Sequence, residues 1–236
     1  RVARQLGTEH HTTECGADDI ARVFPDVVWH AETPLLRTGP APMYLLAGLV
    51  RQHGLKVVLT GEGADEFLVG YDIFKEAKVR SFWARDPGSA YRPRLLRRLY
   101  GHIPEMARPS QSYLEAFFGA DLDRAMDRDF SHSIRWGNTA RLHRHFESGV
   151  QAAIAEAGTR DMAPLLAQQG ARWDTVSRAQ HNEITTFLDP YLLSSQGDRV
   201  AMAHAVEGRF PFLDHRVIEF CNSLPASMKL PGLREK

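Results

Sequence analysis

A short acidic segment, residues 60–66, contains the side chains best suited to chemistry: Thr60-Gly61-Glu62-Gly63-Ala64-Asp65-Glu66. Its two glycines allow backbone N–H groups to approach a ligand closely. Three carboxylates would repel a nucleotide phosphate, but Mg²⁺ binds one or two carboxylates together with phosphate oxygens. The segment therefore predicts a magnesium–nucleotide site. In the alternative interpretation, Asp65 and Glu66 only cap a helix and complement its dipole.

The elements around this segment are predicted from hydrophobic patterning. Residues 56–59 form a short apolar, β-branched run, which predicts a buried parallel strand. A helix is expected to start at Asp65 and to run through Phe74 and Ala77, so that the carboxylates lie at the carboxyl end of the strand, where open α/β sheets bind ligands. A helix over residues 42–53 precedes the strand. The expected fold class is α/β, a partial doubly wound parallel sheet with a mostly helical C-terminal half.

The remaining chain shows further helical patterns. The local signals predict a helix that ends at Leu6 before Gly7, a strand within residues 8–14, and a helix over residues 17–28 that is interrupted at Pro25. Helical segments are expected over residues 110–146, over 151–178 with breaks at Gly158, Pro164 and Gly170, over 183–202 with a kink at Pro190, and after Asp214, which is interpreted as a helix cap.

Composition excludes several classes of protein. The 236 residues contain 29 Lys+Arg and 29 Asp+Glu, so no overall positive field favours nucleic acid or an anionic membrane. The arginines of residues 92–98 are interpreted as a solvated helix face. No stretch is long and apolar enough to span a bilayer. Two distant cysteines, Cys15 and Cys221, provide no disulfide framework, and a cytoplasmic location is expected.

Two long motifs resemble the asparagine synthetase family. Residues 57–66, followed by Gly70-Tyr71, resemble the family signature S-G-E-G-[SA]-D-E…G-Y. Residues 198–214 resemble its D-R-x-x-M-x-x-x-x-E-x-R-x-P-F-L-D block. A weaker similarity extends over most of the chain, so residues 1–236 are identified as one synthetase-like domain, a fragment. The resemblance implies a fold of the adenine nucleotide α-hydrolase type, as in the PP-loop ATP pyrophosphatases.

The resemblance also implies an activity, ATP-dependent and AMP-forming amide synthesis with Mg²⁺. In the family, ATP adenylates the side-chain carboxylate of aspartate and releases pyrophosphate. Ammonia, which a separate N-terminal glutaminase domain releases from glutamine, then attacks the acyl-adenylate. Neither nucleic acid nor a membrane is an expected partner, and a homodimer is left open.

The family pattern assigns roles to individual positions. Thr60, Gly61 and Gly63 would contact ATP, Asp65 would ligate Mg²⁺, and Glu62 would be the catalytic residue that accepts a proton from ammonia. The residues expected to bind substrate are Glu66, Tyr71 and Arg37. Asp198 and Arg209 are expected to support the active site. For Arg37, a solvated loop arginine is the alternative.

The chain also departs from the family pattern. The pyrophosphate loop S-G-G-x-D-S is expected upstream of Arg1, the segment with a catalytic lysine beyond Lys236, and the glutaminase cysteine in a further domain. This polypeptide alone is therefore expected to be inactive. Thr60 replaces the usual serine but keeps its hydroxyl. Two alternatives stay open: a related ligase that closes a lactam or peptide ring by adenylation, and a non-catalytic domain with the same fold.

Overall fold

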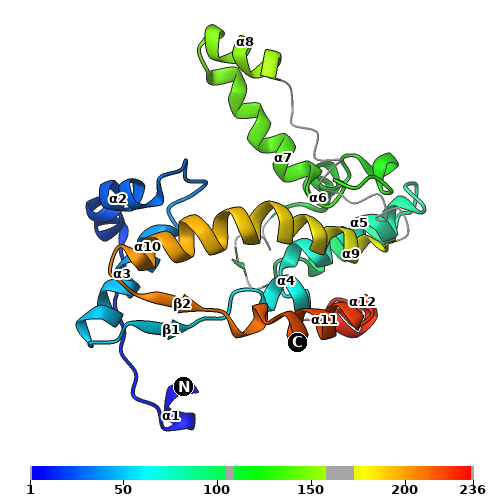
Figure 1. Ribbon diagram of the computed structural model, residues 1–236. Helices are drawn as coiled ribbons and strands as arrows, with labels where there is room; N and C mark the ends of the chain where they lie inside the picture. Colours follow the sequence, from blue (N-terminus) through cyan, green and yellow to red (C-terminus); the bar gives the residue numbers. More distant parts are fainter. Residues whose placement is uncertain (1, 102, 105–108, 158–172, 235–236) are drawn as a thin grey trace. The chain divides into compact units, whose positions relative to one another are not determined.

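The computed structural model describes residues 2–101, 103–104, 109–157 and 173–234 (Figure 1). Its elements are mostly helical, with two short strands. In chain order they are α1 (Val2–Leu6), α2 (Ala17–Ala31), α3 (Pro40–Gln52), β1 (Val57–Leu59), α4 (Ala64–Leu68), α5 (Asp72–Ala84), η1 (Arg92–Arg98), α6 (Gln111–Phe118), η3 (Leu122–Arg124), α7 (Ser133–Ala140), η4 (Arg141–His145), α8 (Ser148–Ala157), α9 (Thr175–Glu183), η6 (Ile184–Asp198), α10 (Arg199–Met202), β2 (Glu207–Arg209), η7 (Pro211–Leu213), α11 (His215–Ser223) and α12 (Ala226–Lys229).

The chain divides into two compact units, which are described separately. Unit 1 comprises Arg1–Glu62 and Phe187–Asp214, and unit 2 comprises Gly63–Thr186 and His215–Lys236. The division falls inside the acidic segment, between Glu62 and Gly63. The predicted site residues therefore belong to two sets.

A small parallel sheet lies in unit 1. β1 pairs with β2 in the register Val57↔Glu207 and Leu59↔Arg209, which confirms the predicted parallel strand and connects the two motifs (Figure 1). The prediction that this strand is buried is wrong, because the side chains of Val57 and Leu59 are 43% and 73% exposed. Within the described chain the sheet has two strands, and so small a sheet cannot cover both of its faces.

Helices α2, α3 and α10 form the core of unit 1. Their buried residues include Val23, Val27, Ala41 and Val200. The helix predicted over 42–53 is confirmed, but it begins at Pro40, since a proline suits the first helical turn. The predicted interruption at Pro25 is wrong, because α2 continues to Ala31. Packing of Val23 and Val27 on either side compensates for the hydrogen bond that proline removes.

Two further predictions for the start of the chain have opposite outcomes. The helix that ends at Leu6 is confirmed, and Gly7 follows it with the positive φ (+67°) that glycine tolerates. The strand predicted within residues 8–14 is wrong, because these residues form neither a strand nor a helix. Their side chains are exposed, so the β-branched composition finds no sheet to join.

Unit 2 begins with two helices where the sequence predicted one. α4 ends at Leu68, and Val69 takes a left-handed conformation (φ 64°) before α5 starts at Asp72. The Gly70 N–H donates to the Asp65 carbonyl at 2.8 Å, which closes the first helix. The continuous helix through Phe74 is therefore a wrong prediction, because the apolar spacing does not register this turn.

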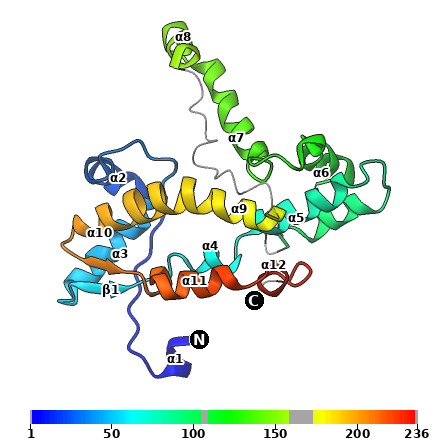
Figure 2. The same cartoon turned by 45° about the vertical axis from the view of Figure 1, so that its right-hand side comes forward.

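Two hydrophobic clusters hold unit 2 together. In the first, α5 packs against α9 through Ile73, Phe74, Val176 and Ala179, and the two helices lie side by side in both views (Figures 1 and 2). The second cluster joins α5, η1 and α6, and its buried members include Val79, Trp83, Leu96, Leu114 and Phe118. α5 therefore belongs to both clusters and is the central helix of this unit.

Several helical predictions for unit 2 are corrected or limited. The segment 110–146 is not one helix, since α6, η3, α7 and η4 divide it. α6 ends at Phe118, and a Cβ atom on the following Gly119 would meet the Trp83 ring at 2.9 Å. The breaks expected at Gly158, Pro164 and Gly170 lie outside the described residues. The exposed arginines Arg94, Arg97 and Arg98 of η1 agree with a solvated face.

The helical prediction over residues 183–202 is confirmed in outline. Helical structure continues from α9 through η6, a π-helix that contains Pro190, into α10. Among the described residues, no helix has the length and apolar character needed to span a membrane. Both cysteines, Cys15 and Cys221, are free.

Candidate active site

The turn after β1 is anchored to the second motif by backbone hydrogen bonds. The Thr60 N–H donates to the Arg209 carbonyl at 2.9 Å, and the Glu207 N–H donates to the Lys56 carbonyl at 2.7 Å. Gly61 follows at the surface, and no atom lies within 4 Å of the position where a Cβ would stand. A ligand can therefore approach the backbone here.

Thr60 and Glu62 line one cavity of about 210 Å³ at the carboxyl end of β1. The other walls are mainly apolar and come from α3, α10 and the β2 segment, including Met43, Val200 and Phe210. The Thr60 Oγ1 and Glu62 Oε2 atoms are buried, and neither has a hydrogen-bond partner among the described residues. A buried polar group without a hydrogen-bond partner costs about 1–3 kcal/mol. A ligand in the cavity can supply the partners that these two atoms lack.

In unit 2, Gly63 and Glu66 form the cap of α4. Gly63 has a φ of +93°, which favours glycine, and its N–H donates to Glu66 Oε2 at 3.1 Å. The Tyr71 hydroxyl donates to Glu66 Oε1 at 2.8 Å. Both carboxylate oxygens of this 1% exposed side chain are thus engaged within the turn. The capping interpretation holds for Glu66, while its contact with substrate, and that of Tyr71, stay predictions.

Burial dominates the electrostatics of this pair. Desolvation raises the pKa of the Glu66 carboxyl, although the hydrogen bond from Tyr71 acts in the opposite direction. Desolvation also raises the pKa of the Tyr71 hydroxyl, and its bond to Glu66 adds to the shift. Tyr71 is therefore neutral at physiological pH and remains a donor to Glu66.

Asp65 lies in the first turn of α4 and is exposed. Its carboxylate lies directly against the Cα of Gly70, where an added Cβ would clash with it. The described residues contain no group of three or more side chains that could hold a metal ion by themselves. An exposed aspartate nevertheless fits magnesium chemistry, because this ion retains water and phosphate oxygens and needs only one or two carboxylates.

Arg37 has a more defined environment than a solvated loop arginine. Its guanidinium stacks on the rings of Phe187 and Tyr191, at 5.0 and 5.4 Å from their centroids, and donates to Gln196 Oε1 at 3.5 Å. Such cation–π contacts orient a guanidinium while leaving its edge available. Contact of Arg37 with substrate stays a prediction.

The two residues predicted to support the site differ in placement. Asp198 is exposed at the end of η6. Arg209 is in β2, where its side chain donates to Glu207 at 2.8 Å and its carbonyl holds Thr60. Met43, Val200 and Phe210 line the cavity although no sequence motif marked them. The only sequence signal for these residues was indirect. Once the second motif pairs with β1, the residues on either side of β2 must lie near the same edge of the sheet.

A family model for asparagine synthase matches residues 1–236. The chain belongs to the asparagine synthase family. This finding confirms the resemblance of the two motifs, and it agrees with a mixed α/β structure that has mostly helices and a small parallel sheet.

Curated relatives of this asparagine synthase-family chain have more than one name. A putative glutamine-hydrolysing asparagine synthetase of Mycobacterium bovis is 31% identical over 97% of this chain and 33% of its own length. An asparagine synthetase of Bacillus subtilis is 26% identical over 97% of the chain and 34% of its length. Amidase chyE of Penicillium rubens is 29% identical over the whole chain and 36% of its length. The chain thus spans about a third of these relatives. No solved structure gives a significant match.

Proposed function

We propose that this chain is part of an ATP-dependent, AMP-forming ligase that converts a carboxylate into an amide, with aspartate as acceptor and ammonia from glutamine as the nitrogen source. The observation that carries the proposal is the pair of buried, unpaired oxygens, Thr60 Oγ1 and Glu62 Oε2, in a cavity at the carboxyl end of β1. Family membership and the names of the synthetase relatives support it.

The chemistry requires activation because a carboxylate is a poor electrophile. Transfer of AMP from ATP to the acceptor carboxylate releases pyrophosphate and creates a good leaving group. Ammonia then attacks the activated carbonyl carbon, loses a proton and expels AMP. Glu62 is the proposed acceptor of that proton, and a positioned general base of this kind contributes roughly 10²–10⁴-fold in rate.

The remaining residues of the segment have binding roles in this proposal. Thr60 would donate its hydroxyl to the nucleotide, and the Gly61 backbone would lie against it. The cavity of about 210 Å³ is smaller than the roughly 300–1,000 Å³ of ordinary small-molecule sites, so it would hold only part of ATP. The family's pyrophosphate loop is the proposed source of the other wall.

Magnesium would be held by Asp65 together with phosphate oxygens, and it would neutralise charge on the pyrophosphate. Glu66 and Tyr71 would fix the turn on which Asp65 lies. Arg37, oriented by its two aromatic rings, would bind a carboxylate of the acceptor. Asp198 and Arg209 would support the sheet edge. The proposal also includes a cytoplasmic location and a glutaminase domain in the intact protein.

A second candidate function differs from the first in the identity of the acceptor. One of the close relatives is named an amidase and not a synthetase. The alternative is therefore the same adenylation chemistry with an acceptor other than aspartate, which includes closure of a lactam or peptide ring.

The decisive measurement is pyrophosphate release by the intact protein with ATP, Mg²⁺ and ammonia, with and without aspartate. We expect release that depends on aspartate, and Glu62→Gln should lower amide formation by at least about 10²-fold because the general base is lost. Glu219→Gln, an exposed glutamate on α11, is the matched control and should leave the rate unchanged. Full turnover by Glu62→Gln would refute the role of Glu62, and release that needs a different acid would favour the alternative.

A further inference from the structure

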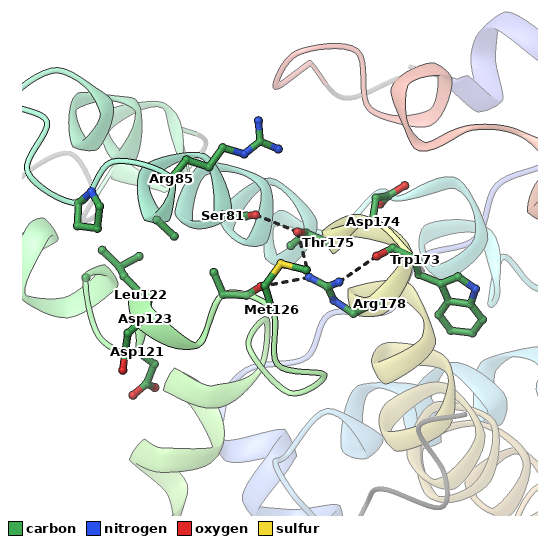
Figure 3. Close-up of a pocket in the computed structure, with 14 residues that line it drawn as sticks. Ser81, Arg85, Asp121, Leu122, Asp123, Met126, Trp173, Asp174, Thr175 and Arg178 are labelled. Atoms are coloured by element: carbon green, nitrogen blue, oxygen red, sulfur yellow. Dashed lines mark hydrogen bonds between the residues drawn. The ribbon is translucent and has the colours of Figure 1, made fainter. Parts of the chain in front are cut away.

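A second cavity, of about 720 Å³, lies entirely within unit 2 (Figure 3). Its walls come from α5, from residues 119–126, and from residues 173–178 at the start of α9. This volume falls within the range of about 300–1,000 Å³ that small-molecule sites occupy. None of the motifs that indicate ATP chemistry contributes to it.

One wall carries a buried cation. Arg178 is 6% exposed, and desolvation lowers the pKa of its guanidinium. The side chain donates to the carbonyls of Trp173 and Ala125 at 2.9 and 3.1 Å, and to Thr175 Oγ1 at 3.4 Å. These bonds use three of its five N–H groups. No described carboxylate forms an ion pair with it, and Asp174, which acts on it only through space, is engaged in capping α9.

Two hydroxyl groups extend this donor surface. The Thr175 hydroxyl donates to Ser81 Oγ at 2.9 Å, and the guanidinium of Arg178 donates to Thr175 (Figure 3). Ser81 therefore acts as an acceptor, and its own hydrogen has no acceptor among the described residues. Arg178 and Ser81 together offer N–H and O–H donors to an anionic group such as a carboxylate.

Another wall of the cavity is acidic. Asp121 and Asp123 line it, and neither side chain forms a hydrogen bond or an ion pair with a described residue. Asp121 interacts through space with the buried Arg80 and with Arg124. Figure 3 shows these two aspartates on the opposite side of the view from Arg178 and Thr175. This wall would repel a phosphate group and attract an ammonium group.

The cavity also has apolar walls. Leu122, Met126 and Trp173 contribute to the lining, so a ligand with an apolar middle would bury surface there. We propose that this cavity binds a zwitterionic ligand of the amino-acid or short-peptide class. Its carboxylate would bind Arg178 and Ser81, and its ammonium group would bind Asp121 and Asp123. The proposal does not depend on the ATP chemistry assigned to the other cavity.

Calorimetric titration of the intact protein with leucine and with leucyl-leucine tests this inference. At least one of these zwitterions should bind. The N-acetyl form, which lacks the ammonium charge, and the carboxamide form, which lacks the carboxylate, should each bind about tenfold more weakly or worse, because each loses one charge-assisted contact. Failure of both zwitterions to bind, or equal binding of the blocked forms, would overturn the proposal.

Substitutions at the cavity locate the binding. Asp123→Asn and Ser81→Ala should each weaken it by about tenfold. Asp127→Asn is the matched control, because Asp127 is an exposed aspartate that pairs with Arg124 and does not line the cavity. This variant should bind the zwitterion as tightly as the parent protein does. Binding should also survive Glu62→Gln. Loss of binding in Glu62→Gln together with full binding in Asp123→Asn would place the zwitterion in the proposed active site and refute a second site.

Discussion

Four described residues of unit 1 have a buried polar side-chain atom without a hydrogen-bond partner. Two of them, Thr60 and Glu62, line the proposed catalytic cavity, and a third, Tyr191, stacks against Arg37. The fourth is His204, whose Nε2 atom is buried without a described partner. Its ring lies 4.3 Å from that of Tyr44 and close to Gly48. His204 occurs within the second motif but does not line the proposed catalytic cavity, so its effect should be on stability.

Protonation of His204 should reduce stability as pH falls. Desolvation, with a smaller contribution from the charge of His30, lowers the pKa of His204 from 6.5. The unfolded chain therefore takes up this proton at a higher pH than the folded chain. The stability contribution of the neutral ring is complete above pH 6.5 and is lost as pH falls through the lowered folded pKa. Urea unfolding at successive pH values measures this loss.

The control for this prediction separates His204 from the other histidines. His204→Gln should flatten the fall in unfolding free energy below pH 6.5, and the same change at the exposed His10 is the matched control. Equal slopes in the parent protein and in His204→Gln would show that folding does not lower the pKa of His204.

At the scale of elements, the turn between α4 and α5 holds Asp65 in place. Gly70 lies so close to the Asp65 carboxylate that a Cβ would overlap it, and would stand 3.2 Å from the Asp65 Cα. Gly70→Ala should therefore destabilise the fold by roughly 1–3 kcal/mol, since backbone and side chain must both shift to relieve the overlap. Chemical denaturation measures the cost, and magnesium dependence of pyrophosphate release would report displacement of Asp65.

Gly137→Ala provides the matched change in an element with open surroundings. No atom lies within 4 Å of the position of its Cβ, and the glycine is inside α7. Replacement there should stabilise the helix by about 0.5–1 kcal/mol, because alanine loses less backbone entropy. If both variants shifted stability in the same direction, the crowding at Gly70 would not be the cause of its effect.

The same elements explain what could be predicted from sequence. The parallel strand β1, the helix α3, the helical structure over residues 183–202 and the cap after Leu6 follow from local composition. The continuous helix through Val69 and the interruption at Pro25 were wrong, because tertiary packing decided both. For the site, the first motif predicted that Thr60 and Glu62 lie at the carboxyl end of β1. Arg178, Asp121 and Asp123 belong to no motif, so only the folded chain reveals that they share a cavity.

At the scale of the whole molecule, charge is balanced while one segment is locally basic. The 29 basic and 29 acidic residues cancel, and the isoelectric point of about 7.3 lies close to physiological pH. Within η1, Arg94, Arg97 and Arg98 are exposed, and Arg94 stacks on Tyr91 at 5.1 Å. Arginines beside an aromatic ring resemble a nucleic-acid surface in composition. The two levels of description therefore lead to opposite expectations. At physiological salt exposed charges act over only about 8 Å, so the three arginines can neutralise only a few phosphates.

We expect η1 to add no measurable affinity for nucleic acid. Proteins that bind nucleic acid non-specifically reach dissociation constants of about 10⁻⁴–10⁻⁶ M by neutralising many phosphates, and three arginines release too few counterions to reach that scale. Filter binding of duplex DNA and of single-stranded RNA should give the same weak retention for the parent protein and for a variant with glutamine at Arg94, Arg97 and Arg98. Retention within that range at physiological salt that disappears in the variant, and declines steeply with added salt, would show that the local arginines outweigh the neutral whole.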